Sequence, residues 1–337
     1  MTYWPAALLL ACTAALQAAL IDFPTENRAL LEDRPQDFYM YVERDFEGVV
    51  SKPWEGGTYG YVRGPQRLGE EVVYTSLHEG IDISPLHRDV TGKPLDDILA
   101  AAAGTVVHAS AEAGASNYGR YIVIAHRIEG SPIYTLYAHL ASLTVQAGQE
   151  VAQGQIIGRL GCSGAGLNQE RAHLHFEIAL LLNQDFEPWY QRYFSQTPNK
   201  HGIYHGFNLV GFDPSAVLLG CAKNPAYSLS AHLLASEPFY KITVPNSPGL
   251  TLIDDYPWLV PAGEPASPRA WTVSFTEYGV PIRATGAEAC PQPHLDWVRE
   301  TPVPYHYATR GILSGSKDSP RLSDAGRRFL ELLCGPM

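Results

Sequence analysis

Short runs of β-branched and aromatic residues recur through the middle of the chain, most of them bounded by Gly or Pro. Thr105–Ala109, Tyr121–Ala125 and Tyr134–Tyr137 show this pattern, which is typical of β-strands. Residues 147–156 hold two glycine turns on either side of another short apolar piece. The pattern predicts a mainly β core between residues 71 and 220.

The flanking regions have different patterns. Residues 21–70 are polar and aromatic with Gly-rich turns, and the Pro-rich passage from Pro238 to Pro268 predicts a linker or an irregular wall. Trp271–Phe275 predicts a strand, and Ser323–Leu333 has the apolar spacing of a helix capped by Ser323. The predicted organisation is a signal peptide at 1–20, an N-terminal extension at 21–70, the core at 71–220, and a C-terminal region at 221–337 of unknown function that we expect to be rich in β-structure.

The first twenty residues are apolar, and no charged side chain precedes Asp22. Ala18 and Ala19 offer small residues for signal-peptidase cleavage, so we expect export to the periplasm, the cell envelope or the extracellular space. Because the run is near membrane-spanning length, an uncleaved membrane anchor is the alternative. Leu9–Cys12 also resembles a lipoprotein box, although it comes early and lacks a preceding basic residue.

Composition narrows the range of partners. The chain of 337 residues is 45% apolar and 18% charged, as expected of a folded globular protein. Its 24 basic and 35 acidic residues give a net charge of −11, and no basic run interrupts the acidic background. We therefore expect no nucleic-acid partner. The oligomeric state does not follow from the sequence.

Cleavage of the leader would leave four cysteines, Cys162, Cys221, Cys290 and Cys334. Four cysteines can pair in three ways in an oxidising compartment. The last two both lie in the C-terminal third, so we expect them to pair with each other. The chain has no Cys-x-x-Cys spacing that would indicate a thiolate metal site.

The first chemical motif is the segment His-Glu-Gly-Ile-Asp. His78 and Asp82 are four residues apart, which places both side chains on one face of a strand or of a helix. Gly80 and Pro85 make a helix improbable here. On a strand, Glu79 would point away from the other two side chains and be a poor candidate for a base.

The second motif is His-Leu-His-Phe-Glu. On a strand, His173 and His175 project from the same face, and paired imidazoles suit zinc. Spacing leaves open which of the two binds metal, and a buried core pair is the alternative. His139 follows the strand at Tyr134–Tyr137. A core would not normally tolerate so many imidazoles and carboxylates, so together they indicate a catalytic metal site.

In this order, the motifs His-x-Gly-x-Asp, Tyr-Ala-His-Leu and His-Leu-His-Phe-Glu resemble the lysostaphin-type (LytM-like) zinc endopeptidase family. The segments at 103–107, 117–124 and 145–158 and the pair Asp213-Pro214 agree with it. The resemblance implies an antiparallel β-sheet core with an open groove, of the duplicated-hybrid-motif type. It also implies a Zn²⁺ cofactor and assigns the site residues: the metal ligands His78, Asp82 and His175, and the catalytic pair His139 and His173, which activate water and stabilise the oxyanion.

The resemblance further implies a secreted zinc metalloendopeptidase that hydrolyses peptide bonds in peptidoglycan cross-links or stem peptides. A non-catalytic wall-binding or amidase-activating module is the first alternative, but such relatives usually lose ligands and this chain keeps all five site residues. A secreted peptidase of soluble proteins is the second. Residues 83–102, 164–172 and the aromatic insertion at 181–207 are longer than the family pattern. We expect these loops to wall the groove, so substrate preference cannot be carried over. His87, His108 and His126 match no site role.

Overall fold

The structure is a computed structural model that describes residues 19–246 and 249–335. The predictions for the leader, including its lipoprotein box, fall on residues 1–18, outside the described residues. Within the described ranges, no helix combines the length and apolar character needed to cross a membrane.

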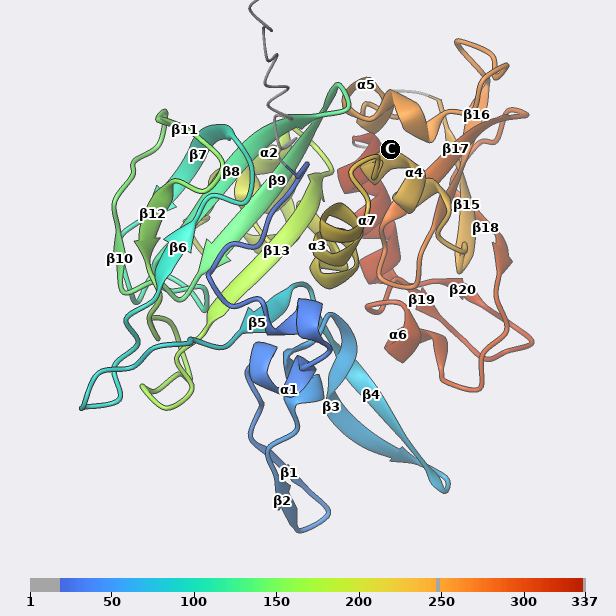
Figure 1. Ribbon diagram of the computed structural model, residues 1–337. Helices are drawn as coiled ribbons and strands as arrows, with labels where there is room; N and C mark the ends of the chain where they lie inside the picture. The colour runs from blue at the N-terminus through green and yellow to red at the C-terminus, as the bar shows by residue number, and fades with distance from the viewer. Residues whose placement is uncertain (1–18, 247–248, 336–337) are drawn as a thin grey trace, which may run out of the picture.

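The core is a seven-stranded antiparallel sheet, which confirms the mainly β prediction (Figure 1). Its strand order is β11-β7-β8-β9-β13-β14, and β5 pairs with β13 beside β14. Every residue of β13 is buried, because an apolar cluster packs on each of its two faces. Its sequence is accordingly apolar apart from His175 and Glu177. The strands are β5 (Ile81–Ile83), β7 (Gly104–Ser110), β8 (Tyr121–Ile128), β9 (Ser131–Ala138), β11 (Glu150–Val151), β13 (Leu174–Leu181) and β14 (Leu209–Phe212).

A small three-stranded sheet lies against this core in the order β10-β12-β6. Ile98 and Ile157 of the small sheet and Ile122 and Ile124 of β8 are fully buried members of one apolar cluster. Burial of such side chains contributes roughly 1.5–3 kcal/mol each. The strands are β6 (Asp97–Leu99), β10 (Ser142–Leu143) and β12 (Ile156–Arg159).

The N-terminal extension forms two hairpins below the core in Figure 1. β3 pairs with β4, and β4 leads directly into the core through His78. The extension therefore reaches the predicted site. The elements within residues 21–70 are η1 (Ala29–Glu32), α1 (Pro35–Phe38), β1 (Arg44–Phe46), β2 (Val49–Ser51), η2 (Trp54–Gly57) and β3 (Gly60–Leu68). Strand β4 (Glu71–His78) follows them, so the predicted boundary after residue 70 falls at the turn of the β3–β4 hairpin.

The C-terminal region builds a four-stranded antiparallel sheet, ordered β17-β16-β15-β18, at the right of Figure 1. Its strands are β15 (Tyr240–Pro245), β16 (Ala270–Phe275), β17 (Pro281–Ala287) and β18 (His294–Val298), followed by the pair β19 (Leu313–Ser314) and β20 (Arg321–Leu322). The helices from the aromatic insertion onward are α2 (Phe186–Phe194), η3 (Gly202–Tyr204), α3 (Pro214–Lys223), α4 (Leu229–Leu234), α5 (Leu252–Asp255), η4 (Pro257–Leu259), α6 (Tyr305–Ala308) and α7 (Asp324–Cys334). The predicted strand at 271–275 and the helix capped by Ser323 are both confirmed.

The prediction for the Pro-rich passage was wrong at its start. Tyr240–Pro245 is a central strand, not a linker or an irregular wall. Pro245 is the last residue of that strand, so no hydrogen-bond donor is missing from the interior of its ladder.

The expected pairing of Cys290 with Cys334 was also wrong. All four cysteines of the described residues are free thiols. Cys334 ends α7 and is buried in the core, whereas Cys290 is half-buried in the loop between β17 and β18. Proximity in sequence therefore does not bring the two sulfur atoms together.

Candidate metal centre

The register of the core sheet places the central site residues side by side. His175 of β13 lies opposite Asp82 of β5 and, on its other side, opposite Ala138 of β9. His139 directly follows Ala138. Directly opposite residues on neighbouring strands hold their side chains about 5 Å apart, so three segments far apart in the sequence meet at His175.

His78 arrives from a different hairpin. It is the last residue of β4, and β5 begins only at Ile81, so Glu79 and Gly80 interrupt the strand. A Cβ on Gly80 would lie 2.4 Å from the main-chain oxygen of Phe176, so only glycine allows this close approach to β13. Strand alternation does not continue through the break, and Glu79 lines the same cavity as His78. The expectation that Glu79 points away from the other two side chains was therefore wrong, whereas its rating as a poor candidate for a base stays a prediction.

Three buried side chains each offer one atom suited to a metal ion: His78, Asp82 and His175. The Nε2 atom of His78 is 3.0 Å from Nδ1 of His175 and 3.1 Å from Oδ1 of Asp82. Nδ1 of His175 is 3.0 Å from the same oxygen. Ligand atoms of a tetrahedral zinc ion lie about 3.3 Å apart, so this triangle has the size of one face of such a site.

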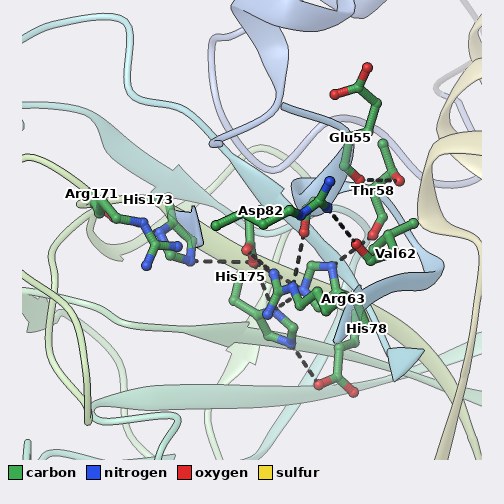
Figure 2. A network of polar contacts seen from close by, with 12 residues as sticks. Glu55, Thr58, Val62, Arg63, His78, Asp82, Arg171, His173 and His175 are labelled. Carbon is green, nitrogen blue, oxygen red and sulfur yellow. Dashed lines mark hydrogen bonds and ion pairs between the residues drawn. The ribbon is translucent and has the colours of Figure 1, made fainter. Parts of the chain in front are cut away.

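Hydrogen bonds around this triangle fix the orientation of its members (Figure 2). Nδ1 of His78 donates to the main-chain oxygen of Thr58 over 2.8 Å, which leaves Nε2 unprotonated for a metal. Nε2 of His175 donates to Glu177 over 2.9 Å, and the Arg63 guanidinium contacts the second oxygen of Asp82. Such outer partners set the tautomers and orientations of metal ligands.

The charges of the site support the same reading. Burial raises the pKa of Asp82, but the neighbouring His173 and His78 lower it well below its ordinary value, so Asp82 is ionised. Burial lowers the pKa of His78, which favours the neutral imidazole that binds metals. Burial also lowers the pKa of His175, but hydrogen bonds to Asp82 and Glu177 outweigh it and raise that pKa to about 9 in the metal-free site.

His139 and His173 lie next to the triangle. Their ring centroids are 4.9 Å apart, and the centroid of His139 is 5.8 Å from that of His175. Nδ1 of His139 donates to the main-chain oxygen of Ser163 over 2.9 Å, and Nδ1 of His173 donates to that of Arg171 over 2.6 Å. Both rings therefore keep Nε2 for other partners, and Nε2 of His173 is 3.3 Å from Oδ1 of Asp82.

Burial, together with the nearby His173 and His175, lowers the pKa of His139 to about 3. His139 is accordingly neutral near pH 7. A neutral imidazole with a free Nε2 has the protonation state that a general base requires.

All five predicted site residues line one cavity of about 800 Å³. Two of the three predicted loops contribute to its walls, through residues 165–167 and through part of the aromatic insertion, including His201 and His205. The third loop, residues 83–102, does not line the cavity, so that part of the prediction was wrong. His87, His108 and His126 do not line it. Instead, Nδ1 of His126 donates to the main-chain oxygen of Ala103 within the core, and its Nε2 lies 2.7 Å from the Thr135 hydroxyl.

Sequence reasoning missed several residues of this cavity. Glu177 is buried and receives a second hydrogen bond from Tyr118, over 2.9 Å; its place two residues after His175 on a strand was the available signal. Arg63 and Arg310 come from the N- and C-terminal regions. No local sequence pattern links them to the site.

Comparison with known proteins identifies the domain that carries this centre. Residues 76–188 match peptidase family M23. A curated lipoprotein NlpD/LppB homolog of Pseudomonas aeruginosa is 35% identical over 130 residues, which cover 39% of this chain and 38% of that protein. The chain thus matches well under half the length of this relative.

Solved structures with similarity include two peptidase catalytic domains. That of lysostaphin from Staphylococcus simulans is 30% identical, covering 36% of this chain and 75% of that chain, with a TM-score of 0.25. That of the prophage-encoded M23 protein EnpA from Enterococcus faecalis is 22% identical, covering 41% and 79%, with a TM-score of 0.26. On the family match and the motifs within it, the chain carries a lysostaphin-type (LytM-like) domain of peptidase family M23.

Proposed function

We propose that this protein is a zinc metalloendopeptidase that hydrolyses peptide bonds of peptidoglycan, with His78, Asp82 and His175 as the metal ligands. The observation that carries the proposal is the triangle of three buried ligand atoms, 3.0–3.1 Å apart, at the wall of an accessible cavity. Three protein ligands with an open fourth position are typical of catalytic zinc sites, whereas structural sites are closed by four.

The donor set fits zinc better than calcium or magnesium. Two imidazole nitrogens and one carboxylate oxygen form the triangle, whereas calcium and magnesium prefer oxygen ligands alone. When bound, zinc supplies a Lewis acid that lowers the pKa of water and polarises a carbonyl group.

His139 and His173 act on the substrate and on water. His139, neutral near pH 7, takes the proton of the attacking water through Nε2 while its Nδ1 is held by Ser163. His173, held through Nδ1 by the main chain of Arg171, faces the site with Nε2. From there its imidazole stabilises the oxyanion as the carbonyl becomes tetrahedral.

Peptidoglycan is proposed as the substrate from the family and the relative. The family motifs resemble cell-wall endopeptidases, and the curated relative is a lipoprotein homolog. The apolar leader supports export to the cell envelope, with cleavage, lipidation or membrane anchoring as its possible fates.

The test combines metal analysis with digestion of purified peptidoglycan. We expect about one zinc per chain and release of peptide fragments that mass spectrometry identifies as products of amide hydrolysis. His78→Ala and His175→Ala should each abolish both zinc binding and hydrolysis, because two remaining ligands do not hold the ion. Arg127→Gln, on an exposed part of β8 outside the cavity, is the control and should keep both.

The two alternatives predict different outcomes. A non-catalytic wall-binding or amidase-activating module would leave purified peptidoglycan intact and stimulate hydrolysis only when an amidase is added. A peptidase of soluble proteins would cut casein but not peptidoglycan. Either result, obtained with zinc-loaded protein, would refute the proposed activity.

A further inference from the structure

Three arginines line the cavity of the metal centre, and two of them have carboxylate partners. Arg63 contacts Asp82 and also donates to the main-chain oxygen of Gly56 over 2.9 Å. Arg310, from the C-terminal region, is 3.1 Å from Glu79. These two guanidinium groups are neutralised by the protein itself.

Arg171 is the third, and its guanidinium has no acceptor among the described residues. Its Nε atom is buried without a hydrogen-bond partner, although the residue lines the cavity. The residue as a whole is half-buried, but a buried donor atom without a partner is destabilising. A ligand that supplies an acceptor in the cavity would recover that free energy.

The position of Arg171 is fixed relative to the catalytic pair. Its main-chain oxygen accepts the 2.6 Å hydrogen bond from His173, and its main-chain nitrogen donates to Asn168 over 2.9 Å. Figure 2 shows the Arg171 side chain on the His173 side of the site, away from Arg63. A group bound by Arg171 would therefore lie beside His173, on the side of the site away from Arg63.

We propose that Arg171 binds a carboxylate of the substrate, so that the preferred substrate is a peptide with a free carboxyl group close to the scissile amide. This rests on the proposed peptidase function. Guanidinium binds carboxylate through two parallel hydrogen bonds, which confer both strength and orientation. The protein carries a net charge of −11, and a local cation in the cavity favours the entry of an anionic substrate.

The acidic side chains of the cavity do not compete for Arg171. Glu79 and Asp82 already pair with Arg310 and Arg63. Glu177 accepts from His175 and Tyr118. Of the three arginines that line the cavity, Arg171 is thus the one without a carboxylate partner among the described residues. A bound metal ion would add further positive charge.

The experiment compares two forms of one substrate. Purified peptidoglycan is used either untreated or after its free carboxyl groups have been converted to carboxamides with carbodiimide and ammonia. Hydrolysis is followed as release of soluble fragments by the zinc-loaded full chain and its Arg171→Gln, Arg171→Lys and Arg127→Gln variants. We expect the parent and Arg127→Gln to prefer the untreated form by roughly 10- to 100-fold in kcat/KM, the range of one charge-assisted bidentate pair.

Arg171→Gln should remove the preference, so that both forms are cut at similar rates, with the loss mainly in KM for the untreated form. Arg171→Lys should retain part of the preference for the untreated form. Lysine keeps the positive charge but lacks the planar guanidinium group that forms two parallel hydrogen bonds. Equal rates on both forms by the parent, or an unchanged preference in Arg171→Gln, would overturn the inference while leaving the peptidase function intact.

A binding measurement separates this inference from failure of catalysis. A fluorescent stem tripeptide, with free or amidated carboxyl groups, is titrated into zinc-loaded His139→Ala protein and into the double variant with Arg171→Gln. We expect a preference for the free carboxylates that the second substitution removes. If no form of peptidoglycan is hydrolysed but this preference is found, the proposed activity fails and the carboxylate site stands.

Discussion

His139 has a left-handed backbone, with a φ of +64°. Few residues other than glycine adopt this conformation, and those that do cluster at functional sites. It follows the last residue of β9 and turns the ring out of the strand towards His173, where the two rings make an edge contact. The local strain is thus part of how this imidazole reaches the centre.

Replacing His139 should separate turnover from metal binding. His139→Ala and His139→Asn are both expected to keep zinc, because neither removes a proposed ligand, and to lose roughly 10²- to 10⁴-fold in kcat. Asparagine tolerates a positive φ better than alanine, so equal losses in the two variants assign the effect to the missing imidazole. Zinc analysis and single-turnover kinetics provide the measurement, and a parental rate in either variant would contradict the role.

The proton on His175 should make metal binding depend on pH. In the metal-free site the pKa of His175 is about 9, above its ordinary value of 6.5, so at pH 7 the ring is protonated and a metal must displace that proton. Zinc affinity should therefore rise by up to about tenfold per pH unit below pH 9 and level off above it. Chelator competition at a series of pH values measures the slope, and a flat profile from pH 6.5 to 8.5 would be incompatible with this state of His175.

At the scale of elements, the β3–β4 hairpin carries His78 at its end and also contacts a second site residue, Asp82. Arg63 of β3 bridges the main-chain oxygen of Gly56 and the second carboxylate oxygen of Asp82. The N-terminal extension thereby orients the proposed ligand Asp82 through Arg63. It also orients His78 through the main-chain oxygen of Thr58.

Removing that bridge should weaken metal binding without unfolding the core. Arg63→Met keeps the apolar stem and is expected to lower zinc affinity by roughly 10- to 100-fold, the usual effect of losing an outer partner of a ligand. Arg67→Met is the matched control, because Arg67 lies on the same strand but pairs with the exposed Glu47. Chelator titration compares the two, and equal affinities would show that Arg63 does not orient Asp82.

At the scale of the whole molecule, one buried apolar cluster extends from Ile21 to Cys334 and includes both large sheets. Polar contacts join the same parts: the Tyr256 hydroxyl accepts from the main-chain nitrogen of Leu181, and the Trp189 indole donates to the main chain of Arg328. The C-terminal region thus packs directly on the end of the strand that carries His175.

The Tyr256 contact offers a test of this coupling. Tyr256→Phe leaves the buried Leu181 donor without a partner and should cost about 1–3 kcal/mol, lowering Tm by roughly 2–10 °C. Tyr240→Phe is the control, because the buried Tyr240 hydroxyl has no hydrogen-bond partner among the described residues and its removal should be neutral or stabilising. Calorimetry measures the Tm of both variants. Equal changes in Tm would argue against a stabilising role for the Tyr256–Leu181 hydrogen bond.

The strands and the helix at 324–334 followed from local patterns, because alternation, β-branching and capping act between neighbours in the chain. The interruption at Glu79–Gly80 could not be predicted from local patterns. Glycine is required at position 80 because the main-chain oxygen of Phe176, nearly a hundred residues later in the chain, lies too close for a Cβ atom. The Pro-rich strand at Tyr240 and the four unpaired cysteines were missed for the same reason.

The sequence by itself determined which residue types are available for chemistry: four histidines and one aspartate in three motifs, each on or beside a strand. Only the tertiary structure decided how they meet. The register of β13 places Asp82 of β5 on one side of His175 and Ala138 of β9, which His139 follows, on the other. The surrounding acceptors determine which ring nitrogen of His78 and His175 faces the proposed metal site. The arginines at 63, 171 and 310 acquire their roles there too, because charge compensation in a cavity depends on distances in space that the order of residues does not contain.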